Sequence, residues 1–244
     1  MHIPKQMIYE NSKKIVFFIH GFMGSPNQFC ELMEKVYNEG FSVVSILLPG
    51  HGSTGFEFAK STVGDWESYL RKEILRYRDY EKVYFVGHSI GGLLALNMSL
   101  EFNICGVVAI SSPLKIYLLN LTANGKRLKI LCSNKEKEPR KTYIKSFGIN
   151  KPYLHTVILW IRVMFEPHKL MKKSKKILKN ISVPVLTIHS KNDETVSFKS
   201  RDLFKEQLLS SAHEAIELIE SYHAYYTESE KEIIDSAIVE FISK

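Results

Sequence analysis

The sequence predicts an α/β fold in which a mostly parallel sheet carries helices on both faces. Short runs of β-branched and aromatic residues alternate with longer segments of helical period along the chain. The length of 244 residues suits one sizeable domain with insertions. A composition of 45% hydrophobic and 24% charged residues is typical of a globular protein.

The first predicted strand covers residues 14–19 and ends at the glycine-rich turn 20–24. A helix is expected from Pro26, because Ser25 can cap it and proline at the first helical position lacks only a donor that would be unpaired. Gly40 is expected to end this helix. Its apolar positions recur at spacings of three and four: Phe29, Leu32, Met33, Val36 and Tyr37.

The remaining strands and helices follow from the same alternation of patterns. Further strands are predicted at 41–48, 83–86, 104–110, 183–189 and 214–219. Further helices are predicted at 65–78, 89–101, 198–209 and 228–242. Residues 1–112 and 183–244 therefore form the predicted core, and residues 113–182 form a helical insertion. Within the insertion, the lysine-rich stretch 169–179 has the apolar spacing of an amphipathic helix.

The positive charge of the chain is concentrated in this insertion. The formal net charge is +7, but residues 113–182 alone carry +14 and the rest of the chain carries −7. A basic segment beside apolar residues resembles an interfacial helix that rests on anionic lipid. A solvated basic face explains the charge equally well. Nucleic acid is not an expected partner, because no recognition motif accompanies the charge.

Segments that would direct the chain to a membrane or out of the cell are not evident. The longest apolar runs, such as 15–19 and 43–48, are far shorter than the roughly 20 residues of a membrane-spanning helix. The first residues lack the apolar stretch of a secretory signal, so a cytoplasmic location is expected. Cys30, Cys105 and Cys132 are an odd number without close spacing, which favours reduced thiols over disulfides or a zinc site.

The chemistry is concentrated in the motif Gly87-His88-Ser89-Ile90-Gly91, where a predicted strand runs directly into a predicted helix. Glycines two residues before and after the serine permit the sharp, strained turn that exposes a nucleophilic hydroxyl. The serine also lies at a helix N-terminus, where backbone N–H groups favour negative charge. The motif by itself can arise by chance, but its place between strand and helix is the context that a nucleophile requires.

A serine needs a histidine as general base and a carboxylate to orient that histidine. In this fold they follow the serine in the order acid, then histidine. His223 comes after the last predicted strand, whereas His213 precedes that strand. Asp193 lies just past the end of strand 183–189, and Glu194 is the fallback acid. An ordinary turn aspartate and a surface histidine are the alternative interpretations of these two positions.

Two backbone N–H groups are expected to stabilise the oxyanion of a tetrahedral intermediate. One is the N–H of Ile90, directly after the serine, and the other is that of Phe22 in the turn His20-Gly21-Phe22-Met23-Gly24. A plain glycine turn is the alternative for the second segment. His20 is expected to brace the loop, and packing or local hydrogen bonding is expected of His88 and His189.

These motifs resemble those of bacterial carboxylesterases and monoacylglycerol lipases, serine esterases of the α/β-hydrolase fold. The similarity rests on the order and spacing of His20-Gly21-Phe22, Leu48-Pro49-Gly50-His51-Gly52, Asp65-Trp66, the Ser89 motif, Asn192-Asp193 and Ser221-Tyr222-His223. Tyr222 replaces the glycine that usually precedes the histidine. The resemblance implies that residues 113–182 form a cap over the serine. Its apolar residues line an acyl pocket or form the core of the cap: Tyr153, Leu154, Val157, Leu159, Trp160, Met164 and Phe165.

The predicted activity is hydrolysis of carboxylic esters, small or lipid-like, by acyl transfer through Ser89, with no metal or organic cofactor. A thioesterase or a carbon–carbon bond hydrolase or lyase could use the same residues, because a fold does not determine a reaction. A binding protein that retains the residues without turnover is the alternative from another class. The acyl chain, the alcohol and the oligomeric state do not follow from the sequence.

Overall fold

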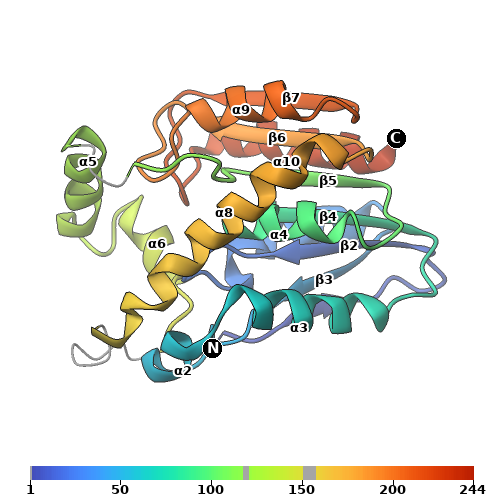
Figure 1. Ribbon diagram of the computed structural model, residues 1–244, viewed down its shortest axis with the longest axis horizontal. Helices are drawn as coiled ribbons and strands as arrows, with labels where there is room; N and C mark the ends of the chain where they lie inside the picture. Colours follow the sequence, from blue (N-terminus) through green and yellow to red (C-terminus); the bar gives the residue numbers. More distant parts are fainter. Residues whose placement is uncertain (1, 118–120, 151–157) are drawn as a thin grey trace.

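The computed structural model describes residues 2–117, 121–150 and 158–244. Seven strands form one sheet in the order β1-β3-β2-β4-β5-β6-β7 (Figure 1). Every neighbouring pair is parallel except β1 with β3. The strands are β1 Lys5–Met7, β2 Lys14–Ile19, β3 Ser42–Ile46, β4 Lys82–His88, β5 Gly106–Ile110, β6 Val185–Ser190 and β7 His213–Leu218.

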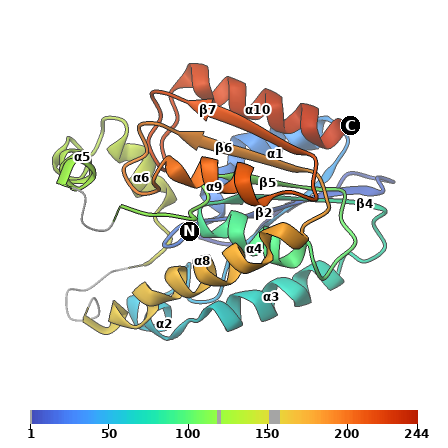
Figure 2. The same ribbon diagram turned by 45° about the horizontal axis from the view of Figure 1, so that its top comes forward.

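Helices cover both faces of the sheet, and each face has its own hydrophobic core. Alternate residues of β2 point to opposite faces, as the period of a strand requires. One face packs against η1 Pro26–Phe29, α1 Cys30–Asn38 and α10 Glu228–Ser243. The other packs against α2 Gly55–Lys60, α3 Val63–Leu75, α4 Ile90–Met98, α8 Glu166–Ile177 and α9 Lys199–Gln207 (Figure 2).

The predicted strands and the predicted helices outside the insertion are all present, with ends that shift by a few residues. The predictions missed β1 and α2. β1 has three residues, Lys5, Gln6 and Met7, and only its pairing with β3 makes it a strand. α2 has six residues, which is too short for a helical period to be recognised.

The start of the first helix differs from the prediction in one detail. Ser25 occupies the N-cap position and Pro26 begins the helix, but the Ser25 side chain makes no capping hydrogen bond. Its hydroxyl instead donates to the carbonyl of Ser146, 3.2 Å away in the insertion. The expectation that the Ser25 side chain caps this helix was therefore wrong, because a tertiary acceptor takes the hydroxyl.

The described residues between β5 and β6 include several helices. Among them are α5 Leu121–Cys132, α6 Arg140–Ser146, η2 Ile158–Ile161, η3 Val163–Phe165, α8 and η4 Leu178–Asn180. Helices α5 and α6 lie beyond one end of the strands, at the left of both views (Figures 1 and 2). The boundaries of a separate cap at 113 and 182 stay a prediction.

The amphipathic helix predicted at 169–179 is confirmed as α8, and it packs in the helical layer over the sheet. Its Ser174 accepts a hydrogen bond from Asn97 of α4 at 2.8 Å, and both side chains are buried. Its Glu166 accepts the N–H of Val63 at the start of α3 at 2.9 Å. Lys173 lies 2.5 Å from Glu67 of α3. Among the described helices, none combines the length and the apolar character needed to cross a membrane.

Candidate active site

Ser89 lies in a strained turn between β4 and α4. Its backbone has φ 54° and ψ −122°, a conformation that residues with a side chain rarely adopt. The turn is possible because its flanks are glycines. A Cβ on Gly87 would lie 2.3 Å from the main chain of Gly91, and a Cβ on Gly91 would lie 2.0 Å from the carbonyl oxygen of Ile19. The glycines of the motif therefore allow α4 to approach the sheet closely. Ser89 is held at the N-terminal end of this helix.

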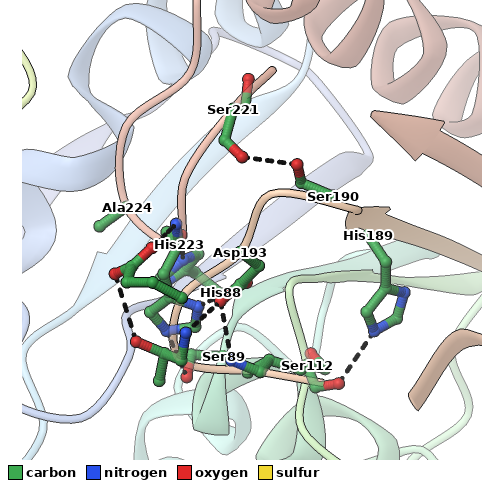
Figure 3. Close-up of polar contacts among 12 residues, drawn as sticks. His88, Ser89, Ser112, His189, Ser190, Asp193, Ser221, His223 and Ala224 are labelled. Carbon is green, nitrogen blue, oxygen red and sulfur yellow. Dashed lines mark hydrogen bonds and ion pairs between the residues drawn. The ribbon is translucent and has the colours of Figure 1, made fainter. Parts of the chain in front are cut away.

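A chain of hydrogen bonds connects Ser89, His223 and Asp193 (Figure 3). The Oγ of Ser89 lies 3.1 Å from Nε2 of His223, and Nδ1 of His223 lies 2.9 Å from Oδ2 of Asp193. This geometry fits the tautomer in which Nδ1–H donates to the carboxylate and Nε2 accepts the serine proton. The three residues follow the carboxyl ends of β4, β6 and β7, and because these strands are parallel, their carboxyl ends lie along the same edge of the sheet, with β5 between β4 and β6.

Asp193 is held as an ionised acceptor although it is buried. Burial raises its pKa. The electrostatic interaction and hydrogen bond with His223 and the N–H groups of Val196 and Thr195 lower the pKa by more, so the pKa of Asp193 lies below its usual value. Both N–H groups lie 2.7 Å from Oδ1, which leaves Oδ2 for the histidine ring. The carboxylate therefore orients the ring and stabilises its protonated form.

Glu194, the predicted fallback acid, is bonded to the main chain of the histidine. Its Oε2 accepts the N–H of His223 at 3.0 Å. Its side chain is 1% exposed. Two adjacent carboxylates thus hold one histidine, Asp193 by the ring and Glu194 by the backbone.

The histidine loop has further supports. His88 lies beside His223, with ring centroids 4.9 Å apart, and its Nε2–H donates to the His223 carbonyl at 2.8 Å. Glu230 of α10 accepts the N–H groups of Ile219, Glu220 and Ser221. Ser190 at the end of β6 donates to the carbonyl of Ser221 at 2.5 Å (Figure 3). Residues at the ends of β4 and β6 and on α10 therefore position the histidine loop.

The second predicted oxyanion segment lies against Ser89. A Cβ on Gly21 would lie 3.0 Å from Cβ of Ser89, so the turn after β2 directly adjoins the serine. Within the described part of the chain, no hydrogen bond engages the N–H of Phe22 or of Ile90. Ile90 is the first residue of α4, where such donors are free by geometry. Both groups thus remain available to an oxyanion.

Two buried histidines brace this turn. His20 donates Nδ1–H to the Gly21 carbonyl at 2.9 Å and accepts the N–H of Leu48 at 3.1 Å. His51 accepts the N–H of Met23 at 3.2 Å. Burial lowers the pKa of His20 well below its usual value and that of His51 to about 4. Both rings are neutral at physiological pH, as their mixed donor and acceptor roles require.

Residues 10–230 match the family described as serine aminopeptidase, S33. The chain belongs to this family. It is 26% identical over 240 residues to the thermostable monoacylglycerol lipase of Bacillus sp. strain H-257, covering 96% of this chain and 92% of that protein. It is 20% identical to the carboxylesterase of Bacillus subtilis strain 168, covering 99% and 97%.

The fold is shared with solved α/β hydrolases. The crystal structure of the monoacylglycerol lipase of Paleococcus ferrophilus aligns with a TM-score of 0.75 at 20% identity, covering 99% of this chain and 98% of that one. The predicted α/β-hydrolase fold and the predicted resemblance to bacterial carboxylesterases and monoacylglycerol lipases are therefore confirmed.

Tyr222 stands in the histidine loop at the position where a glycine is expected from the resemblance, and it is accommodated without backbone strain. It has no positive φ, so the backbone at this position does not require glycine. Its N–H donates to the carbonyl of Tyr225 at 2.8 Å, which closes a turn around His223. Its ring packs beside that of Tyr225, with centroids 6.4 Å apart.

The apolar residues of the insertion are only partly described. Tyr153, Leu154 and Val157 lie outside the described residues. Trp160 is buried and packs edge-on against Phe58 of α2, with centroids 5.3 Å apart. The other members of the predicted set are exposed: Leu159, Met164 and Phe165. Their role as a pocket lining stays a prediction.

Two supports of the histidine loop were not predicted from the sequence. Glu230 was part of a predicted helix without a role of its own, and Tyr143 of α6 was not singled out. Tyr143 donates its hydroxyl to Glu194. The local sequence signal for these supports was Glu194, an acidic residue directly after Asp193. No local signal marks Tyr143, because it meets Glu194 only in the folded chain, 51 residues away.

Proposed function

We propose that this protein hydrolyses carboxylic esters through an acyl-enzyme on Ser89, with His223 as general base and Asp193 as the orienting acid. The hydrogen-bonded chain from Ser89 Oγ to Asp193 Oδ2 is the observation that supports this most directly. The strained turn at Ser89 adds support, because such strain persists where the surrounding structure exposes a nucleophile.

The mechanism follows from the positions of these groups. His223 Nε2 takes the hydroxyl proton as Ser89 Oγ attacks the ester carbonyl, and the N–H groups of Phe22 and Ile90 stabilise the oxyanion. The protonated His223 then donates its proton to the leaving alkoxide. In the second half, His223 takes a proton from the water that attacks the acyl-enzyme, and it returns that proton to Ser89 Oγ as the bond to the acyl group breaks and the acid is released. Asp193 stabilises the charged ring in both halves and remains ionised.

The substrate class is proposed from the relatives. Proteins named monoacylglycerol lipase and carboxylesterase are similar to this chain over nearly its whole length. An acylglycerol or a simple ester with an apolar acyl group is therefore the proposed substrate. The exposed apolar side chains of Leu159, Met164 and Phe165, at the insertion, suit an acyl chain.

The test is hydrolysis of nitrophenyl esters and monoacylglycerols of increasing acyl length. The wild type is expected to turn over these substrates, and Ser89→Ala is expected to lower kcat by at least about 1,000-fold. A matched control is Ser99→Ala at the end of α4, which removes a hydroxyl from the same helix. Undiminished activity of Ser89→Ala would contradict the proposal.

The same panel separates the alternatives. Acyl thioesters test the thioesterase, and amino-acid nitroanilides test the peptidase activity that the family description names. We expect oxygen esters to be preferred over both, because the curated relatives are named for ester hydrolysis. A higher kcat/KM for nitroanilides would replace the ester proposal with a peptidase.

We also propose that the basic insertion contacts anionic membranes and that the protein is cytoplasmic. Exposed lysines on α8 and exposed apolar residues on η2 and η3 lie close together along the chain. Co-sedimentation with vesicles that contain phosphatidylserine is expected, and it should weaken as salt is raised. Equal recovery with purely zwitterionic vesicles would contradict the membrane contact.

A further inference from the structure

The short segment Tyr143–Gly148 of the insertion contacts both halves of the candidate active site. It contains the end of α6 and the residues that follow it. Tyr143 lies at the histidine loop, and Gly148 lies at the turn after β2. An element that contacts both loops can hold the general base and the oxyanion donors in one geometry.

The contact with the histidine loop runs through Glu194. The hydroxyl of Tyr143 donates to Oε1 of Glu194, and Oε2 of the same carboxylate accepts the N–H of His223 at 3.0 Å. The Tyr143 oxygen also accepts the N–H of Ala224 at 3.3 Å. Two consecutive N–H groups of the loop, at His223 and Ala224, are therefore held by one tyrosine–carboxylate pair.

The pair is suited to a fixed position and not to proton transfer. Burial and the neighbouring Glu194 raise the pKa of Tyr143 well above its usual value, so the hydroxyl keeps its proton and acts as a donor at physiological pH. Tyr143 and Glu194 hold the main chain at His223 and Ala224, whereas Asp193 and Ser89 bond to the ring of His223. A buried carboxylate satisfied by several donors is rigid, because each lost bond leaves a charge unsatisfied.

The contact with the oxyanion turn is made by the main chain. The N–H of Gly148 donates to the Met23 carbonyl at 2.7 Å, directly after Phe22. Met23 has φ 58°, so this bond supports a strained residue. A Cβ on Gly148 would lie 1.9 Å from the carbonyl oxygen of Gly24, so only glycine permits this approach.

We infer that Tyr143, acting through Glu194, is a positioning residue for His223, and that the segment Tyr143–Gly148 thereby completes the active site from within the insertion. The inference rests on the proposed function. It means that part of the insertion positions the groups of the active site, in addition to the substrate binding proposed for the insertion. Removing the Tyr143 hydroxyl should then slow the chemical step and leave substrate affinity nearly unchanged.

The first test compares Tyr143→Phe with the wild type on a nitrophenyl ester. We expect kcat to fall between about tenfold and 100-fold and KM to stay within about twofold, because a displaced base affects the transition state more than the bound substrate. The rate at which a fluorophosphonate labels Ser89 should fall by a similar factor. Circular dichroism and a thermal melt establish that the variant is folded at the assay temperature.

Tyr80→Phe is the matched control. It also removes a hydroxyl that donates a hydrogen bond, 2.9 Å from Ser42, but at the opposite ends of β3 and β4 from the candidate site. We expect its kcat to equal that of the wild type. A fall in kcat that is the same in both variants would show a general loss of structure and would overturn the inference.

Glu194→Gln supplies a second variant with the same prediction, and it decides the question if Tyr143→Phe does not fold. In the double variant the losses should not multiply, because both changes break one network. If the fold-losses in kcat of the two single variants multiply fully in the double variant, the inference is overturned. It is also overturned, while the proposed function stands, if both single variants have wild-type kcat and Ser89→Ala is inactive. An active Ser89→Ala would instead overturn the proposed function on which it rests.

Discussion

His88 and His223 form a contact that joins the nucleophile strand to the histidine loop. Nε2–H of His88, the residue before Ser89, donates to the main-chain carbonyl of His223 at 2.8 Å. Burial, reinforced by the nearby charge of His223, lowers the pKa of His88 to about 3. The ring is therefore a neutral donor, and the residue that precedes Ser89 helps to hold His223 at its distance from Ser89.

Replacing His88 tests this contact. His88→Ala should leave the His223 carbonyl without its donor and lower kcat by roughly tenfold to 100-fold, from the 1–3 kcal/mol of a lost buried hydrogen bond. His88→Gln retains an amide donor and should lose less activity. The measurement is kcat with a nitrophenyl ester for both variants. Equal losses in the two would argue against a role for the hydrogen bond.

Asp193→Asn should lower kcat by about 1,000-fold to 10,000-fold, because an amide favours the wrong tautomer of the histidine. Glu194 cannot replace the lost carboxylate, since its Oε2 is bonded to the main chain of His223. The comparison is Asp202→Asn on α9, an aspartate whose side chain is 47% exposed and pairs with Arg201. Residual activity near that of the wild type would indicate that another acid orients the ring.

Gly91→Ala should destabilise the fold, because the added Cβ would lie 2.0 Å from the carbonyl oxygen of Ile19. We expect a loss of about 3 kcal/mol or more in the free energy of unfolding, which is the upper range for overpacking. Gly125→Ala in α5 is the control, because nothing lies within 4 Å of its Cβ and alanine favours a helix. Urea unfolding of both variants gives the comparison, and equal stability would contradict the packing account.

The buried neutral histidines predict a loss of stability in mild acid. His51, His88 and His189 have pKa values of about 4, about 3 and about 4 in the folded protein, against 6.5 for the exposed group, each chiefly because of burial. As pH falls below 6.5 the unfolded chain gains protons that the folded chain does not. The protein therefore has its full stability at pH values above 6.5. At pH 5, each of these histidines has lowered the free energy of unfolding by about 2 kcal/mol.

Urea midpoints at pH 7.5, 6 and 5 measure this dependence. The lowered pKa of Asp193 affects stability only below about pH 4, so the interval from pH 6.5 to 5 reports mainly on the histidines. A midpoint that is constant from pH 7.5 to 5 would show that these rings become protonated within the folded protein.

The candidate triad could be predicted because each member is marked by local sequence. Ser89 lies in a glycine motif between a strand and a helix, and Asp193 and His223 follow strand ends in an order that the fold requires. Parallel strands bring their carboxyl ends to one edge, so residues far apart in sequence meet there. This part of the site is determined by topology.

The supports of the site could not be predicted in the same way. Tyr143 meets Glu194, and Gly148 meets Met23, only through the path of the insertion, which carries no local pattern that indicates these partners. The same holds for Ser25, whose hydroxyl bonds to Ser146 and does not cap its own helix. Such contacts depend on tertiary packing, which can override local preference.

Mass spectrometry after fluorophosphonate labelling tests the central claim most directly. We expect one equivalent of the probe to be bound covalently to the peptide that contains Ser89. We also expect His223→Ala to slow the labelling by several orders of magnitude. Rapid labelling of a different serine, or labelling of Ser89 at an unchanged rate in His223→Ala, would contradict this claim.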